Sequence, residues 1–334
     1  MKNISIKEIA KLSGVSTATV SRVINNNGRF SEETRQKVLR VMEETGYQMN
    51  YSAKTLRMNK SFSIGILVPD ITNYFFANVV EKIETILFDQ GYSTIICNTG
   101  RNVEKEAAYL SMLEGKMIDG LIIISGADEF EFQVQNDKKT IPYICIDREP
   151  KEKNKTVFVS SNHYQGAFEA AEHLLQQGVK HPIIVMHQRN SSSAKERLDG
   201  FKDALKKNNY SFNPDKHRLD FNLDSSHDKK SLQEFLQQQN DVDGLFAIND
   251  DIALNILDYL REFEVAVPAQ MKVIGFDNVP AGQHSAPRLT SINQDTQKIA
   301  EMATSSLIKL IDGNKEIQGE ISLVPVQLIR REST

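Results

Sequence analysis

The sequence predicts an α/β protein in which a small helical head precedes a much larger body. Three observations carry this prediction. Short amphipathic segments with helix caps and glycine turns fill residues 4–46, whereas apolar runs alternate with helical stretches from about residue 61 to residue 334. Charge divides at the same place, because residues 1–60 carry a net charge of +6 and the remaining residues carry −10. A basic head on an acidic body is typical of a protein that binds polyanions.

Residues 4–25 predict two short helices joined by a tight turn. Ser5 and Ser16 are N-cap candidates for the two helices, and Gly14 allows a sharp turn without a Cβ clash. This pattern is typical of a helix-turn-helix, whose second helix enters a DNA major groove. An ordinary two-helix corner in a globular domain is the alternative. The residues expected to face inward are Ile6, Ile9, Ala10, the pair Leu12-Ser13, Val20, Val23 and Ile24.

A third helix is predicted from the N-cap Ser31 to Gly46, with Glu32 and Glu33 in its first turn. Three short helices suffice for a small DNA-binding head. The positive charge of the head fits attraction to backbone phosphates. We therefore expect this part of the chain to bind double-stranded DNA.

Two stretches resemble one known family. Residues 15–23, with the sequence VSTATVSRV, and residues 46–57, with the sequence GYQMNYSAKTLR, are similar to the LacI/GalR family of bacterial transcription regulators. The resemblance covers essentially the whole chain and implies a hinge helix whose leucine enters the minor groove at the operator centre. Leu56 is the matching leucine. The residues expected to contact DNA are Ser16, Thr17, Ala18, Thr19, Ser21, Arg22, Asn25, Tyr47, Asn50, Ala53, Lys54 and Leu56.

This hinge departs from the family pattern at two positions. Met49 stands where proline is usual, which loosens the entry to the helix, and Lys54 stands where arginine is usual. Asn50 can cap only about two turns, and isolated helices of that length are marginal in water. We therefore expect the hinge helix to form only against a partner hinge and a DNA groove. A plain interdomain linker is the alternative.

Seven apolar runs in the body predict buried strands at residues 63–68, 94–97, 120–124, 143–146, 183–186, 244–248 and 272–276. Apolar runs separated by helices are typical of parallel sheets covered on both faces. The resemblance implies two Rossmann-like lobes of periplasmic-binding-protein type I with three crossovers. The expected domains are a head at 1–48, a hinge at 49–60 and an effector-binding and dimerisation body at 61–334. Within the body we expect a first lobe at about 61–160 and 291–322 and a second at about 161–290 and 323–334.

The effector site is expected where the strands end, because doubly wound sheets bind ligands at the carboxyl ends of their strands. Aromatic faces can sandwich a sugar ring, carboxylates accept hydrogen bonds from hydroxyls, and guanidinium and amide groups donate them. Two carboxylates would repel a phosphate, which favours a neutral polyol. The expected effector-binding residues are Asn73, Phe75, Phe76, Asp147, Arg148, Arg197, Phe221, Asn249, Asp277 and Gln294.

These strand ends also resemble those of ribose-binding proteins and ribose-type repressors, which implies ribose or a related monosaccharide as ligand. Ser125 departs from that pattern, since those proteins often carry asparagine there. Plainer interpretations remain: Phe75 and Phe76 as core packing, Asp250 and Asp251 as helix caps, and Asp147 with Arg148 as a surface ion pair.

The sequence does not favour an enzyme. It has no dinucleotide-binding or phosphate-cradling glycine motif, no G-x-S-x-G elbow, and no histidine spacing typical of a zinc site. A glycosidase would use paired carboxylates but would leave the basic head unexplained. We therefore expect no catalytic residues, no metal and no cofactor.

The chain is expected to be cytoplasmic and associated with the bacterial nucleoid. It has no apolar span of membrane length and no signal peptide. Cys97 and Cys145 lie within apolar runs and have no metal-ligand partners nearby, which favours buried, reduced thiols.

The functional expectation is a homodimeric transcriptional repressor of a carbohydrate operon. Two heads would read a palindromic operator, and a neutral sugar between the lobes would release it. A ligand that prefers the closed, hinge-unfolded state weakens DNA binding through linkage. The alternative is a corepressor-dependent regulator activated by a metabolite or a phosphoprotein partner.

Overall fold

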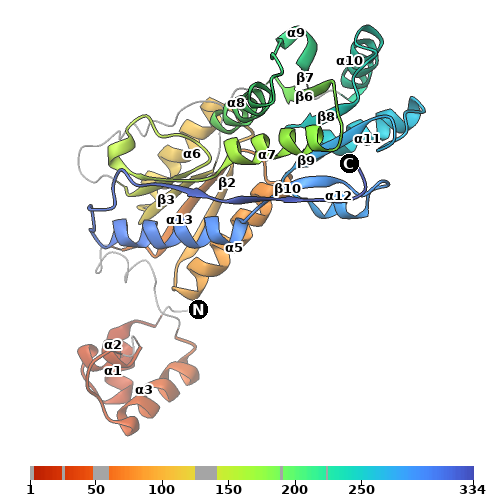
Figure 1. The fold of residues 1–334 in the computed structure, drawn as a ribbon. Helices are drawn as coiled ribbons and strands as arrows, with labels where there is room; N and C mark the ends of the chain where they lie inside the picture. The colour runs from red at the N-terminus through yellow and green to blue at the C-terminus, as the bar shows by residue number, and fades with distance from the viewer. Residues whose placement is uncertain (1–3, 25–26, 48–59, 125–140, 189–190, 223–224) are drawn as a thin grey trace. The chain divides into compact units, whose positions relative to one another are not determined.

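The computed structural model describes residues 4–24, 27–47, 60–124, 141–188, 191–222 and 225–334. Contacts divide the chain into two compact units, Met1–Ser61 and Phe62–Thr334, which correspond to the helical and the α/β parts in Figure 1. None of the helices in the described ranges is long and apolar enough to cross a membrane.

The first unit contains the three predicted helices, α1 (Ile6–Ser13), α2 (Thr17–Ile24) and α3 (Glu32–Thr45). Ser5 and Glu8 form a reciprocal capping box at the start of α1, which ends at Gly14 with a left-handed φ of 65°. The structure therefore confirms Ser5 as the N-cap of the first helix and Gly14 as the turn that follows it. The buried core that joins the three helices consists of Ile9, Ala10, Val20, Val23 and Val38.

The predicted burial of Leu12 is wrong, because its side chain is 58% exposed. Ser13, the other member of the expected pair, is the one that is buried, since it lies four residues after Ile9 on the same helix face. The Ser13 hydroxyl donates a hydrogen bond of 2.6 Å to the carbonyl of Ile9, so this buried polar group is satisfied within the helix.

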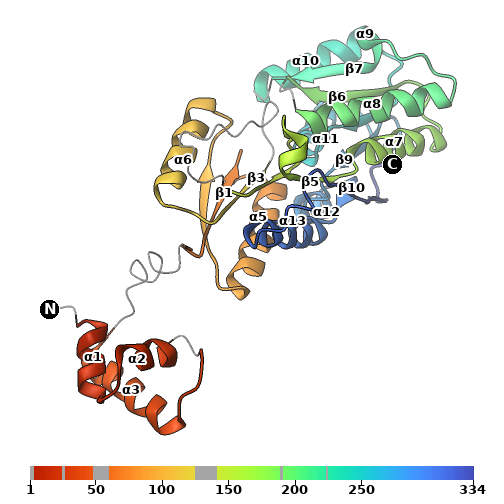
Figure 2. The same cartoon turned by 90° about the vertical axis from the view of Figure 1, so that its left-hand side faces the viewer.

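The first sheet of the second unit has the order β11-β5-β4-β3-β1-β2, and all its ladders are parallel. Its strands are β1 (Ser63–Val68), β2 (Ser93–Asn98), β3 (Gly120–Ile124), β4 (Tyr143–Ile146), β5 (Val157–Ser161) and β11 (Ile321–Val324). The helices that belong to this lobe are α5 (Tyr74–Asp89), α6 (Val103–Gly115) and α13 (Thr296–Ile311), with a short 3-10 helix η1 (Lys153–Lys155). Helices α5 and α13 lie side by side along the sheet (Figures 1 and 2).

The second sheet has the order β12-β10-β9-β8-β6-β7 and is parallel except for β12, which pairs antiparallel with β10. Its strands are β6 (Pro182–His187), β7 (Arg218–Phe221), β8 (Gly244–Ala247), β9 (Lys272–Phe276), β10 (Thr290–Gln294) and β12 (Val326–Ile329). The helices of this lobe are α7 (His163–Gln176), α8 (Ser192–Lys207), α9 (Pro214–His217), α10 (Ser225–Gln238), α11 (Asp250–Glu262) and α12 (Pro280–His284).

The chain crosses between the sheets three times, after β5, after β10 and between β11 and β12. The α/β class and the two Rossmann-like lobes are therefore confirmed, and each of the seven predicted apolar runs overlaps a strand. The expected start of the second first-lobe segment, residue 291, is too early. Strand β10 (Thr290–Gln294) belongs to the second sheet, because it pairs with β9 and β12, and α13 is the first element after the crossover.

Both cysteines are unpaired and buried, as predicted. Burial disfavours the thiolate and raises the pKa of Cys97 and of Cys145. These thiols therefore behave as small apolar groups of the first lobe, where they pack in one cluster around Leu67 and Ile123.

Candidate functional site

Helix α2 presents the predicted outward face. Ser16 caps the helix, since its Oγ accepts a hydrogen bond of 3.1 Å from the backbone N–H of Thr19. Val20 and Val23 lie in the core, whereas polar and small residues remain accessible. Thr17, Ala18 and Arg22 are exposed, and Thr19 and Ser21 are half-buried.

The other residues expected to contact DNA are not all on this helix. Tyr47 follows α3 and packs half-buried against the core of the head. The remaining predicted contacts lie outside the described residues and stay predictions: Asn25, Asn50, Ala53, Lys54 and Leu56.

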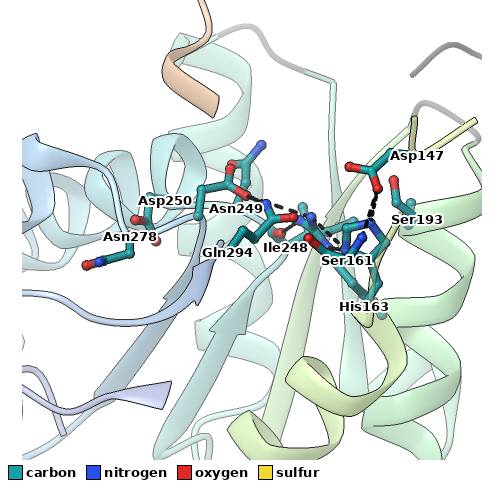
Figure 3. A network of polar contacts seen from close by, with 12 residues as sticks. Asp147, Ser161, His163, Ser193, Ile248, Asn249, Asp250, Asn278 and Gln294 are labelled. Carbon is teal, nitrogen blue, oxygen red and sulfur yellow. Dashed lines mark hydrogen bonds and ion pairs between the residues drawn. The ribbon is translucent and has the colours of Figure 1, made fainter. Parts of the chain in front are cut away.

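In the second unit, a chain of polar contacts joins the ends of strands from both sheets (Figure 3). Asp147 follows β4 in the first lobe, and Oδ1 of its carboxylate lies 3.1 Å from Nε2 of His163 at the start of α7. Nδ1 of His163 accepts from Nε of Arg197 on α8 at 3.4 Å. Nη2 of Arg197 lies 3.7 Å from Oδ1 of Asp277 after β9. Gln294 at the end of β10 donates to the same Asp277 oxygen at 2.7 Å.

Asp147 is held as an oriented anion. Its backbone has a left-handed φ of 53°, and its Oδ1 accepts from the Ser160 hydroxyl at 2.7 Å and the Ser161 N–H at 3.2 Å. Burial alone would raise the pKa of Asp147, but His163, the Ser160 hydrogen bond and Arg197 together lower it. In the described part of the chain, the contacts of this carboxylate go to Oδ1, which leaves Oδ2 available to a ligand.

Arg197 is buried and held on several sides. Its guanidinium stacks on the ring of Phe276 at 3.7 Å from the centroid, and Nη1 donates to the carbonyl of Ile248. Burial lowers the pKa of Arg197, and Asp277 and Asp147 oppose that effect, so the group stays charged. Arg197 and Asp277, both expected to bind the effector, thus lie in contact with each other, and their contacts with a ligand stay predictions.

Asp277 and Gln294 form the second-lobe end of the network. The backbone of Asp277 has φ of 112°, a strained region for a residue with a side chain. Burial raises the pKa of Asp277 well above its ordinary value, with Arg197 opposing and Asp250 adding to the rise. The Oε1 atom of Gln294 is buried and has no hydrogen-bond partner among the described residues, so a ligand donor would satisfy it.

Two of the predicted aromatic residues lie in the cores of the lobes. Phe75 is 5% exposed within the first-lobe core, and Phe221 is 1% exposed within the second-lobe core. Packing therefore accounts for both positions. Phe76 is half-buried, with its edge against Phe75 and the Arg101 guanidinium 5.7 Å from its ring centroid.

Asn73 and Asn249 both cap helices. Asn73 caps α5 and donates a hydrogen bond of 2.9 Å to Asp251, which ties the first lobe to the second. Asn249 caps α11 through the N–H of Ile252, so the cap predicted for Asp250 and Asp251 belongs to the preceding residue. Ligand contacts of the two asparagines stay predictions.

Arg148 does not pair with Asp147. Its Nη1 lies 2.8 Å from Oε2 of Glu106 on α6, and both side chains are largely buried. The interpretation of Asp147 and Arg148 as a surface ion pair is therefore wrong. Asp147 faces the network through His163, whereas Arg148 anchors α6.

His163 was not among the residues expected at the site, yet it links the carboxylate of Asp147 to the guanidinium of Arg197. Asp250, expected as a helix cap, is instead buried and accepts from the Val279 N–H at 2.7 Å and the Ser291 hydroxyl at 2.6 Å. Burial raises the pKa of Asp250 to about 7. His163 follows β5, a strand that the apolar runs did not include, so its position at a strand end carried no signal.

Family models match both parts of the chain. The model described as "Bacterial regulatory proteins, lacI family" matches residues 5–50, and that of a periplasmic binding protein-like domain matches residues 171–334. A ribose operon repressor of Halalkalibacterium halodurans is 31% identical over 99% of this chain and 97% of its own length. A transcriptional repressor PurR of Aliivibrio salmonicida is also 31% identical, over 98% of each chain.

A solved structure gives the same result for the fold. A LacI family transcriptional regulator from Enterococcus faecium with bound ribose matches 81% of this chain and 98% of its own, with a TM-score of 0.70 and 28% identity. The helical head, the two-lobed body and the relatives that match over nearly the whole chain all indicate the same family. The chain therefore belongs to the LacI family of bacterial transcriptional regulators.

Proposed function

We propose that this protein is a homodimeric transcriptional repressor of a carbohydrate operon, released from its operator by a neutral monosaccharide bound between the two lobes. The observation that carries this proposal is the network from Asp147 to Gln294, which joins both sheets at their carboxyl ends. A ligand held by both ends of such a network would favour one relative placement of the lobes.

The chemistry of the network favours a ligand with many hydroxyl donors. Oδ2 of Asp147 and Oε1 of Gln294 are acceptors that the described residues leave open. Arg197 already donates to His163 and Ile248, so little of its fork remains for an anion. A phosphate would also meet the ionised Asp147, and we therefore favour a free sugar over a phosphosugar.

The relatives support two effector classes. The ribose operon repressor and the ribose-bound regulator support ribose or a related monosaccharide. A repressor named PurR is equally similar to this chain. We therefore keep a second candidate, a corepressor-dependent regulator in which a metabolite, with a purine as the one to test, strengthens operator binding. The two candidates differ in the sign of the response, since differential affinity for the two conformations sets the direction of linkage.

Operator release by a ligand panel tests the proposal. Fluorescence anisotropy would follow the full-length protein on a labelled palindromic operator selected from random DNA. D-ribose, D-xylose, D-glucose, ribose 5-phosphate, hypoxanthine and guanine would be added in turn. We expect a free pentose to weaken operator binding. Tighter binding with a purine would favour the second candidate, and release by ribose 5-phosphate alone would contradict the neutral-ligand proposal.

We expect Leu56→Ala to weaken operator affinity by about tenfold or more and to reduce DNA bending, because an apolar wedge that opens a base step permits additional contacts on the bent duplex. Sugar affinity should not change. Anisotropy and a two-dye bending assay measure the first two quantities, and calorimetry measures the third. Leu12→Ala is the matched control, since Leu12 is an exposed leucine of the head outside α2. Equal losses in both variants would contradict the wedge.

A further inference from the structure

We propose that His163 is a positioning residue of the effector site, and that its neutral form with the proton on Nε2 holds Asp147 and Arg197 in the geometry that a ligand needs. The proposal rests on the proposed function, because it concerns the residues assigned there to the effector. Figure 3 shows the imidazole of His163 below the carboxylate of Asp147.

The imidazole is enclosed on several sides. His163 is 1% exposed. Asp147 approaches from the loop after β4, Arg197 from α8 and the Phe276 ring from the end of β9, with a ring centroid separation of 5.7 Å. Asp147 and Arg197 are the charged groups that act on this imidazole. His163 thus contacts one effector residue of each lobe.

The hydrogen-bond partners select one tautomer. Arg197 Nε and Nη2 lie 3.4 and 3.3 Å from Nδ1 of His163, and a guanidinium has only donors. Nδ1 must therefore carry a lone pair, which places the proton of the neutral ring on Nε2. Nε2 lies 3.1 Å from Asp147 Oδ1, so its N–H faces the carboxylate, but the contact does not have hydrogen-bond geometry and Nε2 has no hydrogen-bond partner among the described residues.

The surroundings also oppose the doubly protonated ring. A proton on Nδ1 would face the N–H groups of Arg197, and the first position of α7 lies at the positive end of a helix dipole. Burial lowers the pKa of His163, Asp147 opposes this effect, and Arg197 adds to it. The ring is consequently neutral near pH 7.

The imidazole also keeps Asp147 and Arg197 apart. Without it, the carboxylate and the guanidinium would attract each other directly in a buried environment, where such attraction is strong. A direct pair would occupy Oδ2 of Asp147, the atom left open to a ligand. Loss of His163 should therefore weaken effector binding, even though His163 acts through Asp147 and Arg197 and does not itself contact the ligand.

A spectroscopic test requires no ligand. Long-range ¹H–¹⁵N correlation spectra of the full-length chain labelled at histidine distinguish the two neutral tautomers and the imidazolium. His163→Gln identifies the signal. We expect the Nε2–H tautomer at pH 7 and a shift of the Nδ1 resonance in Arg197→Ala. An Nδ1–H tautomer, or an imidazolium at pH 7, would overturn the proposal.

Substitutions test the consequence for binding. Glutamine can still accept from Arg197 and donate to Asp147, whereas leucine keeps a similar volume and can do neither. With D-ribose as the calorimetric probe, we expect His163→Leu to lose at least about tenfold in affinity and His163→Gln to stay within about fivefold of wild type. His181→Gln, at a half-exposed surface histidine, is the matched control.

Unfolding temperature and operator affinity would be measured for each variant, since a purely structural role would lower both. Equal affinity in wild type and a folded His163→Leu would overturn the proposal, as would an equal loss in folded His163→Leu and His163→Gln. If wild type binds no sugar of the panel, the proposed function fails, while the tautomer spectrum still decides the positioning role.

Discussion

Arg197→Ala or Asp277→Ala is expected to abolish release of the operator by the sugar and to leave operator affinity in the absence of sugar unchanged. Both side chains belong to the network at the strand ends, and Arg197 connects His163 to Asp277. Losing one partner of a buried charged set typically costs a few kcal/mol, so sugar affinity should fall by about a hundredfold or more. Calorimetry with D-ribose measures the loss, and anisotropy measures operator release.

The loss should have a different physical origin in the two variants. Arg197→Ala leaves Asp277 buried beside Asp250 with Gln294 as its remaining partner, and it also frees the carbonyl of Ile248. Asp277→Ala removes the acceptor of the Gln294 amide, which can then turn away from the ligand. We expect both variants to be less stable than wild type, and unfolding temperatures are therefore recorded with each affinity.

Matched controls come from α11. Arg261 and Asp258 form an exposed ion pair with a separation of 2.9 Å, so Arg261→Ala and Asp258→Ala remove the same side-chain types from the same lobe. Exposed pairs contribute little to stability, and neither control should alter sugar binding. Unchanged sugar affinity in Arg197→Ala and Asp277→Ala would contradict the assigned site. Loss in the controls as well would indicate a general effect on the lobe.

Gly200→Ala is expected to destabilise the body by about 3 kcal/mol, near the upper end for overpacking. A Cβ at Gly200 would lie 2.2 Å from the carbonyl oxygen of Tyr164 and 3.1 Å from the backbone nitrogen of Phe168. These atoms belong to the backbone of α7, so relief requires the two helices to move apart. Because α8 also carries Arg197, we expect sugar affinity to fall together with the unfolding temperature.

Gly115→Ala is the control for this substitution. Gly115 is the last residue of α6, its φ is not positive, and an added Cβ would meet no atom within 4 Å. Alanine is the better helix former, so this variant should be as stable as wild type or slightly more stable. Thermal and urea unfolding of both variants gives the comparison. Equal stability of Gly200→Ala and wild type would show that α7 and α8 are not packed as closely as the structure has them.

Elements whose signals lie among neighbouring residues could be predicted from the amino-acid sequence. The helix caps at Ser5 and Ser16 and the left-handed turn at Gly14 depend on neighbouring residues alone, and the structure confirms all three. The seven apolar runs overlapped strands because buried parallel strands are continuously apolar. The rule that ligands lie at carboxyl ends of strands placed Asp147, Arg197, Asp277 and Gln294 in one set, which the structure brings into one network.

Which strand-end side chains contact one another could not be predicted without the packed fold. Phe221 packs in a core, Arg148 pairs with Glu106 from a helix 42 residues earlier, and His163 inserts between effector residues of different lobes. No pattern among neighbouring residues encodes such contacts, since each depends on how separate elements pack. The same reason applies to β10, whose sheet is set by pairing with β9 and β12. Local periodicity can identify a strand, but its neighbours across the sheet are fixed by packing over the whole fold.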